Sequence, residues 1–340
     1  YFVARKKDLI ILKETMDMDQ AACFTVNPFT AYALMEIALV RESQAIIQNA
    51  AGAQLAAFIR AMAKEHIRHW QIGDVKVTRI VEINAHQDPF TMLSAGTEPD
   101  LGRHYPWLAP HFVTEDGQMK LSFQAFVLKT PDYTIIVDTC IGEGREREYD
   151  IFTHMQSDYL DDLVAAGYDP NKADIVLCTH LHFDHVGWNT REQDGRWVPT
   201  FPNARYLFDR HEYEHWVAER KNGGEHVDHW VDAIDPVVDA GLVDLIDSNH
   251  RVCPEVSLFP TPGHTPGHVS VLISSNGQKA VITGDLMHHP IQLARPDLPM
   301  NADSDKDQGI ATRTEFCRRF ADSDVTVIGS HFCDPTAGKI

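Results

Sequence analysis

The sequence of 340 residues lacks long apolar runs, and this absence argues against a membrane-spanning helix. A membrane helix needs about 18 consecutive apolar residues, and no segment approaches that length. The longest N-terminal apolar stretch, residues 9–12, is too short for the core of a signal peptide, and Lys13 and Glu14 follow it. We therefore predict no membrane partner and see no export signal, while the start at Tyr1 leaves open whether a leader preceded it.

Cysteine is scarce and scattered. None of the six residues forms a C-x-x-C pair; they are Cys23, Cys140, Cys178, Cys253, Cys317 and Cys333. This distribution argues against a disulfide scaffold and against a zinc site made of thiolates. It suits a reducing compartment, so we expect a cytoplasmic protein.

Positive charge is also in short supply. The chain has 30 basic and 49 acidic residues, which gives a formal net charge of −19. Such a surface repels phosphate backbones, so nucleic acid is not an expected partner. Solubility alone is a sufficient reason for this charge.

The first 72 residues differ in pattern from the rest. From Thr30 to Trp70 the sequence is alanine-rich with helical periodicity, and Gly52 divides it into two predicted helices. We predict a helical N-terminal extension over residues 1–72 that packs on the main domain or on a second subunit, as in a homodimer. The alternative that part of it is not native to the folded unit stays open.

Residues 73–340 are predicted to form the catalytic domain, because the periodicity changes to that of strands near residue 74. Strands are expected over residues 75–81, 121–128, 133–137, 175–178, 204–208, 256–259, 269–273, 280–283 and 325–328. Helices are expected over residues 155–166, 210–221 and 308–321, and residues 297–307 read as a polar loop. Strands with interspersed helices and hairpins indicate two sheets flanked by helices.

Histidine is abundant, with 19 residues, and its spacing indicates a metal site. His180 and His182 directly follow the apolar strand 175–178, where residues two apart point to the same side and can bind one metal. Asp184 and His185 come next, at a predicted turn that aims them differently, so they can serve a second metal. A solvated polar loop is the simpler alternative, and the full H-x-H-x-D-H pattern after a strand disfavours it.

The segment Thr179–His185 resembles the signature of the metallo-β-lactamase superfamily. Three further motifs follow in the order of that family: Thr261–His268, which contains two histidines, then Thr283-Gly284-Asp285, then Gly329-Ser330-His331. Val137-Asp138-Thr139 resembles its early strand-end aspartate. The match runs from about residue 75 to Ile340, where related proteins usually continue.

The resemblance implies an α/β fold, a four-layer αββα sandwich with two metal ions, expected to be Zn²⁺, at one edge between the sheets. It implies that His180, His182 and His264 bind the first metal and that Asp184, His185 and His331 bind the second, with Asp285 between them. Histidine and carboxylate ligands suit zinc without any cysteine. Asp138 is a candidate partner for the outer nitrogen of a ligand histidine, or simply a residue that caps a turn.

Other histidines fit the site less well. His211-Glu212-Tyr213-Glu214-His215 matches the H-E-x-x-H signature of zinc proteases, but it lies outside the ordered motifs, so a polar helix face is the preferred interpretation. His226 and His229 are expected to be solvated. We predict a structural role for His268, and a pocket role for one of the pair His288 and His289, preferring His288 as a catalytic proton donor or substrate contact.

The implied chemistry is hydrolysis by a hydroxide that bridges two metals, with Asp184 orienting it or taking its proton. Segments 138–142, 185–189 and 284–289 are most similar to the branch of N-acyl homoserine lactonases and methyl parathion hydrolases, so we expect a small lactone, ester or phosphotriester as substrate. The alternatives are a β-lactamase, a glyoxalase II-like thioesterase and a mononuclear iron persulfide dioxygenase. The acidic charge disfavours an RNase Z-like nuclease, and an intact site disfavours a non-catalytic relic.

Overall fold

The structure is a computed structural model that describes residues 2–3, 10–11, 67–93, 105–224 and 227–340. Its contacts divide the chain into two units, Tyr1–Ile67 and Arg68–Ile340. In the first unit, strand β1 (Phe2–Val3) pairs antiparallel with β2 (Ile10–Ile11). The helices predicted within residues 30–66 lie outside the described residues.

The second unit contains a seven-stranded mixed sheet with the order β11-β10-β7-β6-β5-β4-β3. Its strands are β3 (His69–Ile72), β4 (Val75–Gln87), β5 (Met119–Lys129), β6 (Thr134–Val137), β7 (Ile175–Leu177), β10 (Arg205–Asp209) and β11 (Val243–Ile246). Strands β3 to β6 form an antiparallel meander, and β6, β7, β10 and β11 are parallel. The sheet therefore begins before residue 73, where we predicted the domain to start.

A second sheet has the order β12-β13-β14-β15-β16. Its strands are β12 (Val256–Pro260), β13 (Val269–Ser275), β14 (Gln278–Ile282), β15 (Thr326–Ile328) and β16 (Ala337–Gly338). The pair β14–β15 is parallel and the other pairs are antiparallel. A separate hairpin joins β8 (Thr190–Gln193) to β9 (Arg196–Pro199).

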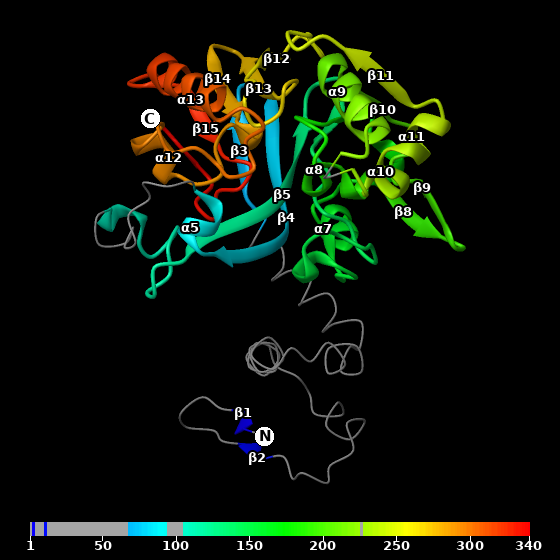
Figure 1. Cartoon of the computed structure of the whole chain (residues 1–340), viewed down its shortest axis with the longest axis horizontal. Coiled ribbons are helices and arrows are strands. Elements are labelled where there is room, and N and C mark those ends of the chain that lie inside the picture. Colours follow the sequence, from blue (N-terminus) through cyan, green and yellow to red (C-terminus); the bar gives the residue numbers. More distant parts are fainter. Residues whose placement is uncertain (1, 4–9, 12–66, 94–104, 225–226) are drawn as a thin grey trace. The chain divides into compact units, whose positions relative to one another are not determined.

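Helices connect these strands and cover the outer faces of both sheets (Figure 1). They are α5 (Pro89–Met92), α7 (Tyr159–Ala165), α8 (Phe183–Val186), α9 (Arg210–Lys221), α10 (Trp230–Ala233), α11 (Asp235–Asp239), α12 (Ile291–Ala294) and α13 (Lys306–Phe320). Short 3-10 turns are η1 (Pro106–Leu108), η2 (Asp150–Phe152), η3 (Pro170–Lys172), η4 (Gly187–Asn189) and η5 (Gly284–Leu286).

Alternation along the strands creates the layers. In β5, Phe126 and Leu128 pack with Val271 and Ile282 of the second sheet, and this cluster is the core between the sheets. Val127, between them in sequence, points the other way and packs with Leu163 and Trp216 of helices α7 and α9. Because successive side chains of a strand point to opposite faces, each sheet is buried on both sides.

The second sheet behaves in the same way. Its outer face places Val281 and Val327 against Phe316 and Phe320 of α13, so the unit is a helix–sheet–sheet–helix sandwich. The predicted four-layer αββα fold is therefore confirmed. No helix of the described segments is long and apolar enough to cross a membrane.

Candidate metal centre

The predicted ligands converge at the carboxyl ends of strands from both sheets. His180 and His182 follow β7, and Asp184 and His185 lie on α8, which begins directly afterwards. The second sheet contributes three side chains from separate loops: His264 between β12 and β13, Asp285 after β14, and His331 after β15. Parallel pairing of β6 with β7 and of β14 with β15 brings these strand ends together.

The donor atoms form two groups, each with atoms within 4.8 Å of one another. In the first group, which we call the first cluster, Nδ1 of His182 lies 3.1 Å from Nε2 of His180 and 3.0 Å from Nε2 of His264. The second cluster consists of Asp184, His185, Asp285 and His331. The structure thus brings together all seven predicted ligands.

Asp285 lies between the clusters and faces both of them. Its Oδ2 is 3.4 Å from Nε2 of His264 and 3.7 Å from Nε2 of His180, on the side of the first cluster. Its Oδ1 is 3.1 Å from Nε2 of both His185 and His331, on the side of the second. One carboxylate oxygen faces each cluster, so Asp285 is placed where it could be shared by two cations.

The outer nitrogens of three ligand histidines are tied to acceptors, and this fixes their tautomers. Nδ1 of His185 lies 3.0 Å from the Asp138 carboxylate, and Nδ1 of His331 lies 3.0 Å from the carbonyl oxygen of Ser122. Nδ1 of His264 lies 3.2 Å from the carboxylate of Asp303. Since each Nδ1–H donates outward, each Nε2 points into the site, where it can bind a cation in the neutral form of the ring.

This arrangement fits divalent cations. Imidazole nitrogens face one another and face the Asp285 carboxylate, and buried Oδ1 of Asp285 has no assigned hydrogen-bond partner among the described residues. A group of acceptors without donors is unfavourable unless protons or cations lie between them. Neutral imidazoles with carboxylates form a set that suits zinc and similar metals.

Electrostatics differ between the clusters. Burial lowers the pKa of His180 and of His182 well below the usual value, which keeps their nitrogens free to bind a cation. For His185, burial also lowers the pKa, but the carboxylates of Asp285, Asp184 and Asp138 outweigh it and raise the pKa well above the usual value. The electrostatic potential at the second cluster is therefore the more negative of the two.

Gly187 and Asp138 fix the backbone around the second cluster. A Cβ on Gly187 would lie 1.9 Å from the carbonyl oxygen of Ile141, so only glycine permits this contact after the histidine motif. Asp138 has a positive φ of 58°, and it also accepts from the backbone N–H of Thr179 at 2.8 Å. Asp138 thus joins the loop after β6 to the loop after β7, in addition to contacting His185.

The remaining histidines separate into three kinds. His268 has a structural position, because its Nε2 accepts from the backbone N–H of Asp285 at 2.8 Å, and burial lowers its pKa to about 3. Nε2 of His289 donates to the carbonyl oxygen of Phe112 at 2.7 Å, and His289 is also fully buried. His288 instead contacts Oδ2 of Asp285 with its Nε2 at 2.9 Å and forms a further donor group with His264 and Asp285.

The H-E-x-x-H segment lies on α9, but His211 and His215 belong to none of the donor groups in the described part of the chain. Glu212 between them is buried and not part of a polar helix face, which corrects our expectation for that residue. His229, expected to be solvated, is 4% exposed, and its Nε2 lies 2.8 Å from the carbonyl oxygen of Leu181. His226 lies outside the described residues.

Sequence reasoning missed Asp303, which it placed in a polar loop. Besides His264, the Asp303 carboxylate accepts from the backbone N–H of Met300 at 3.0 Å and from the guanidinium of Arg313 at 3.1 Å. The side chains of Asp303 and Arg313 are both fully buried. Asp303 is separated from His264 by 39 residues, and no local motif marks it.

Aromatic side chains continue from the second cluster towards solvent. The ring of Phe123 lies 5.0 Å from that of His331 and 5.1 Å from that of Phe152. Phe152 contacts Phe183, and both contact Tyr149, which is 49% exposed. We call these four residues the aromatic wall.

A small pocket lies beside the first cluster. It is lined by the ligand His182 and by Glu146, Arg147, Glu148, Phe183, Asp228 and His229. Arg147 is held by Asp232 at 2.8 Å, so its charge is paired, and Glu146 and Asp228 are exposed acidic residues of the same lining.

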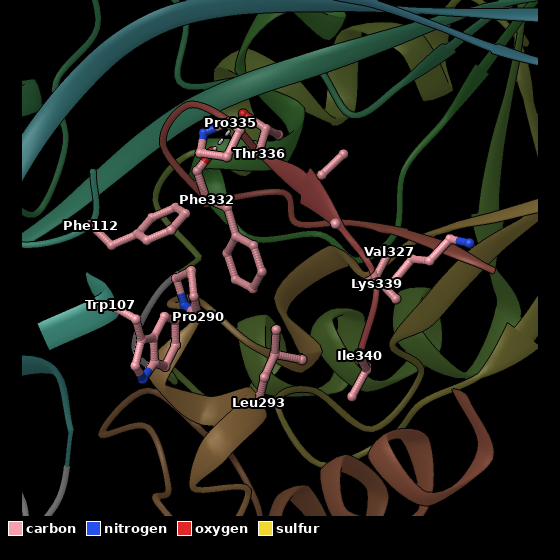
Figure 2. A pocket seen from close by; sticks show the side chains of 12 residues that line it. Trp107, Phe112, Pro290, Leu293, Val327, Phe332, Pro335, Thr336, Lys339 and Ile340 are labelled. Atoms are coloured by element: carbon pink, nitrogen blue, oxygen red, sulfur yellow. Dashed lines mark hydrogen bonds between the residues drawn. The ribbon is translucent and has the colours of Figure 1, made fainter. Parts of the chain in front are cut away.

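A separate apolar pocket of about 220 Å³ lies next to the loop that carries His331. Figure 2 shows Trp107, Phe112, Pro290 and Phe332 around it, and Ile340 lies at its other end. Of its lining residues that the structure describes, only Lys339 carries a charge. It presents no group of metal ligands.

Comparison with known families agrees with this geometry. The model of the Metallo-beta-lactamase superfamily matches residues 124–325, so the chain belongs to that superfamily. The resemblance predicted from the motifs is therefore confirmed.

Individual relatives are more distant. An N-acyl homoserine lactonase of Bacillus sp is 27% identical over 183 residues, which cover 50% of this chain and 65% of the relative. The N-acyl homoserine lactonase AttM of Rhizobium radiobacter is 30% identical over 131 residues, covering 36% of this chain and 44% of the relative. The chain thus spans less than two thirds of the curated relatives it matches.

Solved structures match over more of the chain. The hydrolase AbOPH of the beta lactamase superfamily is 25% identical, with a TM-score of 0.66 over 80% of this chain and 92% of its own. AidC, a dizinc quorum-quenching lactonase in complex with a product, is 22% identical, with the same TM-score and coverage. At this identity the likeness to AidC shows the shared fold.

Proposed function

We propose that this protein is a metal-dependent hydrolase with two Zn²⁺ ions, acting on a small, uncharged lactone or ester, with phosphotriesters as related substrates. The observation that carries the proposal is the position of Asp285, with one carboxylate oxygen towards each of two histidine clusters. His180, His182 and His264 would hold one ion, and Asp184, His185 and His331 the other. When bound, such ions lower the pKa of a water molecule and polarise a carbonyl or phosphoryl oxygen.

Side chains of this protein can transfer the proton in the reaction and orient the ligand histidines. Asp184 is less buried than Asp285, with 12% of its side chain exposed against 3%, so it is the carboxylate that can exchange a proton with a substrate or with water. His288, which contacts Asp285, is the proposed pocket residue that donates a proton or a hydrogen bond. Asp138, Asp303 and the Ser122 carbonyl keep three of the ligand histidines in the tautomer that binds metal through Nε2; these are His185, His264 and His331.

The surroundings favour an uncharged, apolar substrate. The aromatic wall offers apolar surface beside the second cluster, and Glu146 and Asp228 place negative charge at the pocket beside the first. Carboxylates at a pocket rim repel anionic substrates, which include β-lactams with a free carboxylate and thioesters of acidic thiols. The names of the curated relatives support the same choice, since the two described above are N-acyl homoserine lactonases.

The proposal extends to the setting of the enzyme. A cytoplasmic location is consistent with the described cysteines, which are all free. A homodimer remains an expectation, and the mass of the native protein in solution tests it.

A substrate panel tests the proposed reaction. We expect the zinc-loaded full chain to hydrolyse an N-acyl lactone or an aryl ester, with weaker or no cleavage of β-lactams and acidic thioesters. If a β-lactam or an acidic thioester is a much better substrate than every lactone, ester and phosphotriester tested, the substrate class is wrong. If activity requires iron and consumes oxygen, the hydrolase assignment itself is wrong.

A further inference from the structure

Glu212 joins the two loops that carry the ligands of the first cluster. Its Oε1 accepts from the backbone N–H of Leu181 at 3.1 Å, and Leu181 stands between His180 and His182. Its Oε2 accepts from the backbone N–H of Gly267 at 3.0 Å, in the loop that carries His264. The two oxygens of one buried carboxylate thus hold two loops that are more than 80 residues apart in sequence.

The approach of the second loop to α9 is close enough to require glycine. A Cβ on Gly267 would lie 2.2 Å from the backbone nitrogen of Glu212 and 2.6 Å from Oδ1 of Asp209, the N-cap of α9. Such distances are too short for any side chain. This close approach is independent of the hydrogen bond to Glu212 and indicates the same fixed register between the loop and the helix.

Two neighbours strengthen the contact on the side of Leu181. Trp216, one turn after Glu212, donates its Nε1–H to Oε1 of Glu212 at 2.7 Å, and its ring packs at 5.3 Å from that of His182. His229 donates to the carbonyl oxygen of Leu181 at 2.8 Å. The backbone of Leu181, between the two ligand histidines, is therefore held at both its N–H and its C=O.

We propose that Glu212 is a positioning residue for the first cluster: it fixes the relative position of the loops that supply His180, His182 and His264, and it does not touch the second cluster. The inference rests on the proposed metal site. It also gives the glutamate of the H-E-x-x-H segment a role that is not proteolytic, since Glu212 acts from the buried face of the helix.

The test uses Glu212→Gln in the full chain. The glutamine side chain has one acceptor oxygen and one NH₂ group. The NH₂ group must face either the Leu181 and Trp216 donors or the Gly267 donor, so one of the two loops loses its acceptor in either orientation of the amide. Metal retention is measured by elemental analysis against increasing chelator, with His264→Ala and His331→Ala as references for a weakened first and second cluster. We expect one of two equivalents to bind about 10–100-fold more weakly, as is typical when a partner of a ligand is removed, in the pattern of His264→Ala.

Two further variants control the result. His211→Ala with His215→Ala changes both neighbouring histidines of the same helix and should leave both equivalents and the Tm unchanged. Trp216→Phe removes one donor to Glu212 and keeps an aromatic ring, so it should weaken the same equivalent by a smaller factor. This milder variant decides the matter if Glu212→Gln does not fold.

The outcomes separate this inference from the proposed function. If folded Glu212→Gln, or Trp216→Phe where the former fails to fold, keeps both equivalents with the affinity of the unmodified protein, the inference is overturned. Equal weakening of both equivalents also overturns it, because Glu212 would then act through general stability. If the unmodified protein itself binds no metal, the proposed function fails first.

Discussion

Substitution of Asp303 by asparagine should reduce both stability and metal affinity, because two different groups depend on this carboxylate. The amide oxygen of asparagine can still accept from Nδ1 of His264, but its NH₂ then faces the Met300 N–H and the Arg313 guanidinium, which are both donors. Arg313 is fully buried and would lose its charged partner.

The magnitude follows from this burial. Removing one partner of a buried ion pair destabilises a protein by about 3–5 kcal/mol, and for a domain of this size each kcal/mol lowers the Tm by roughly 2 °C. We therefore expect the Tm of the metal-free protein to fall by roughly 6–10 °C. In addition, the loss of a charged partner for His264 should weaken one metal equivalent about 10–100-fold.

Asp297→Asn is the matched control. Asp297 lies in the same loop and pairs with Arg295 at 2.7 Å, but the two side chains are 59% and 34% exposed. An exposed pair of this kind contributes about 0–1 kcal/mol, so the Tm should fall by no more than about 2 °C. Thermal unfolding with and without zinc measures both effects. Equal shifts for Asp303→Asn and Asp297→Asn, with metal affinity unchanged in both, would refute the proposed role of Asp303.

Three further predictions concern the proton-transfer groups and pH. Asp184→Asn should lower turnover by ~10²-fold or more if this carboxylate orients the attacking water as well as binding metal; a change below tenfold in the metal-loaded variant would contradict that role. His288→Ala should lower turnover while two metals stay bound, and loss of an equivalent would show instead that His288 is a ligand. Burial lowers the pKa of His289 to about 4, below its unfolded value. The neutral histidine therefore contributes its full stability above pH 6.5, and this contribution is lost as the pH falls towards 4. At pH 5 the free energy of unfolding is lower by about 2 kcal/mol. His289→Gln should therefore make the denaturant midpoint of the metal-free protein less sensitive to pH between 7.5 and 5, and an unchanged pH slope would contradict it.

The fold was predictable because its strongest patterns are local. Apolar strands such as 175–177 stand directly before the ligand motif, and the predicted helix over residues 210–221 has the bounds of α9. Shorter and more polar elements were missed, including β3, the β8–β9 hairpin and β11. Their sequences have weak periodicity, and pairing with neighbouring strands determines their structure.

The candidate site shows the same division. Ligand residues lie in compact motifs, whereas the groups that orient them are distant in sequence and have no motif of their own. Asp303 contacts His264 across 39 residues, and the partner of His331 is a backbone carbonyl at Ser122, which no side-chain pattern can reveal. Glu212 was visible only as part of a protease-like segment, because sequence spacing does not show which face of a helix is buried.

The most direct test of the central claim is the joint measurement of metal content and turnover. The metal-free chain is titrated with Zn²⁺ while bound zinc and the hydrolysis of an N-acyl lactone or aryl ester are followed in the same samples. The shared position of Asp285 predicts binding of two equivalents per chain, with turnover that requires both. Full activity with one equivalent that added zinc does not increase would contradict the two-metal account.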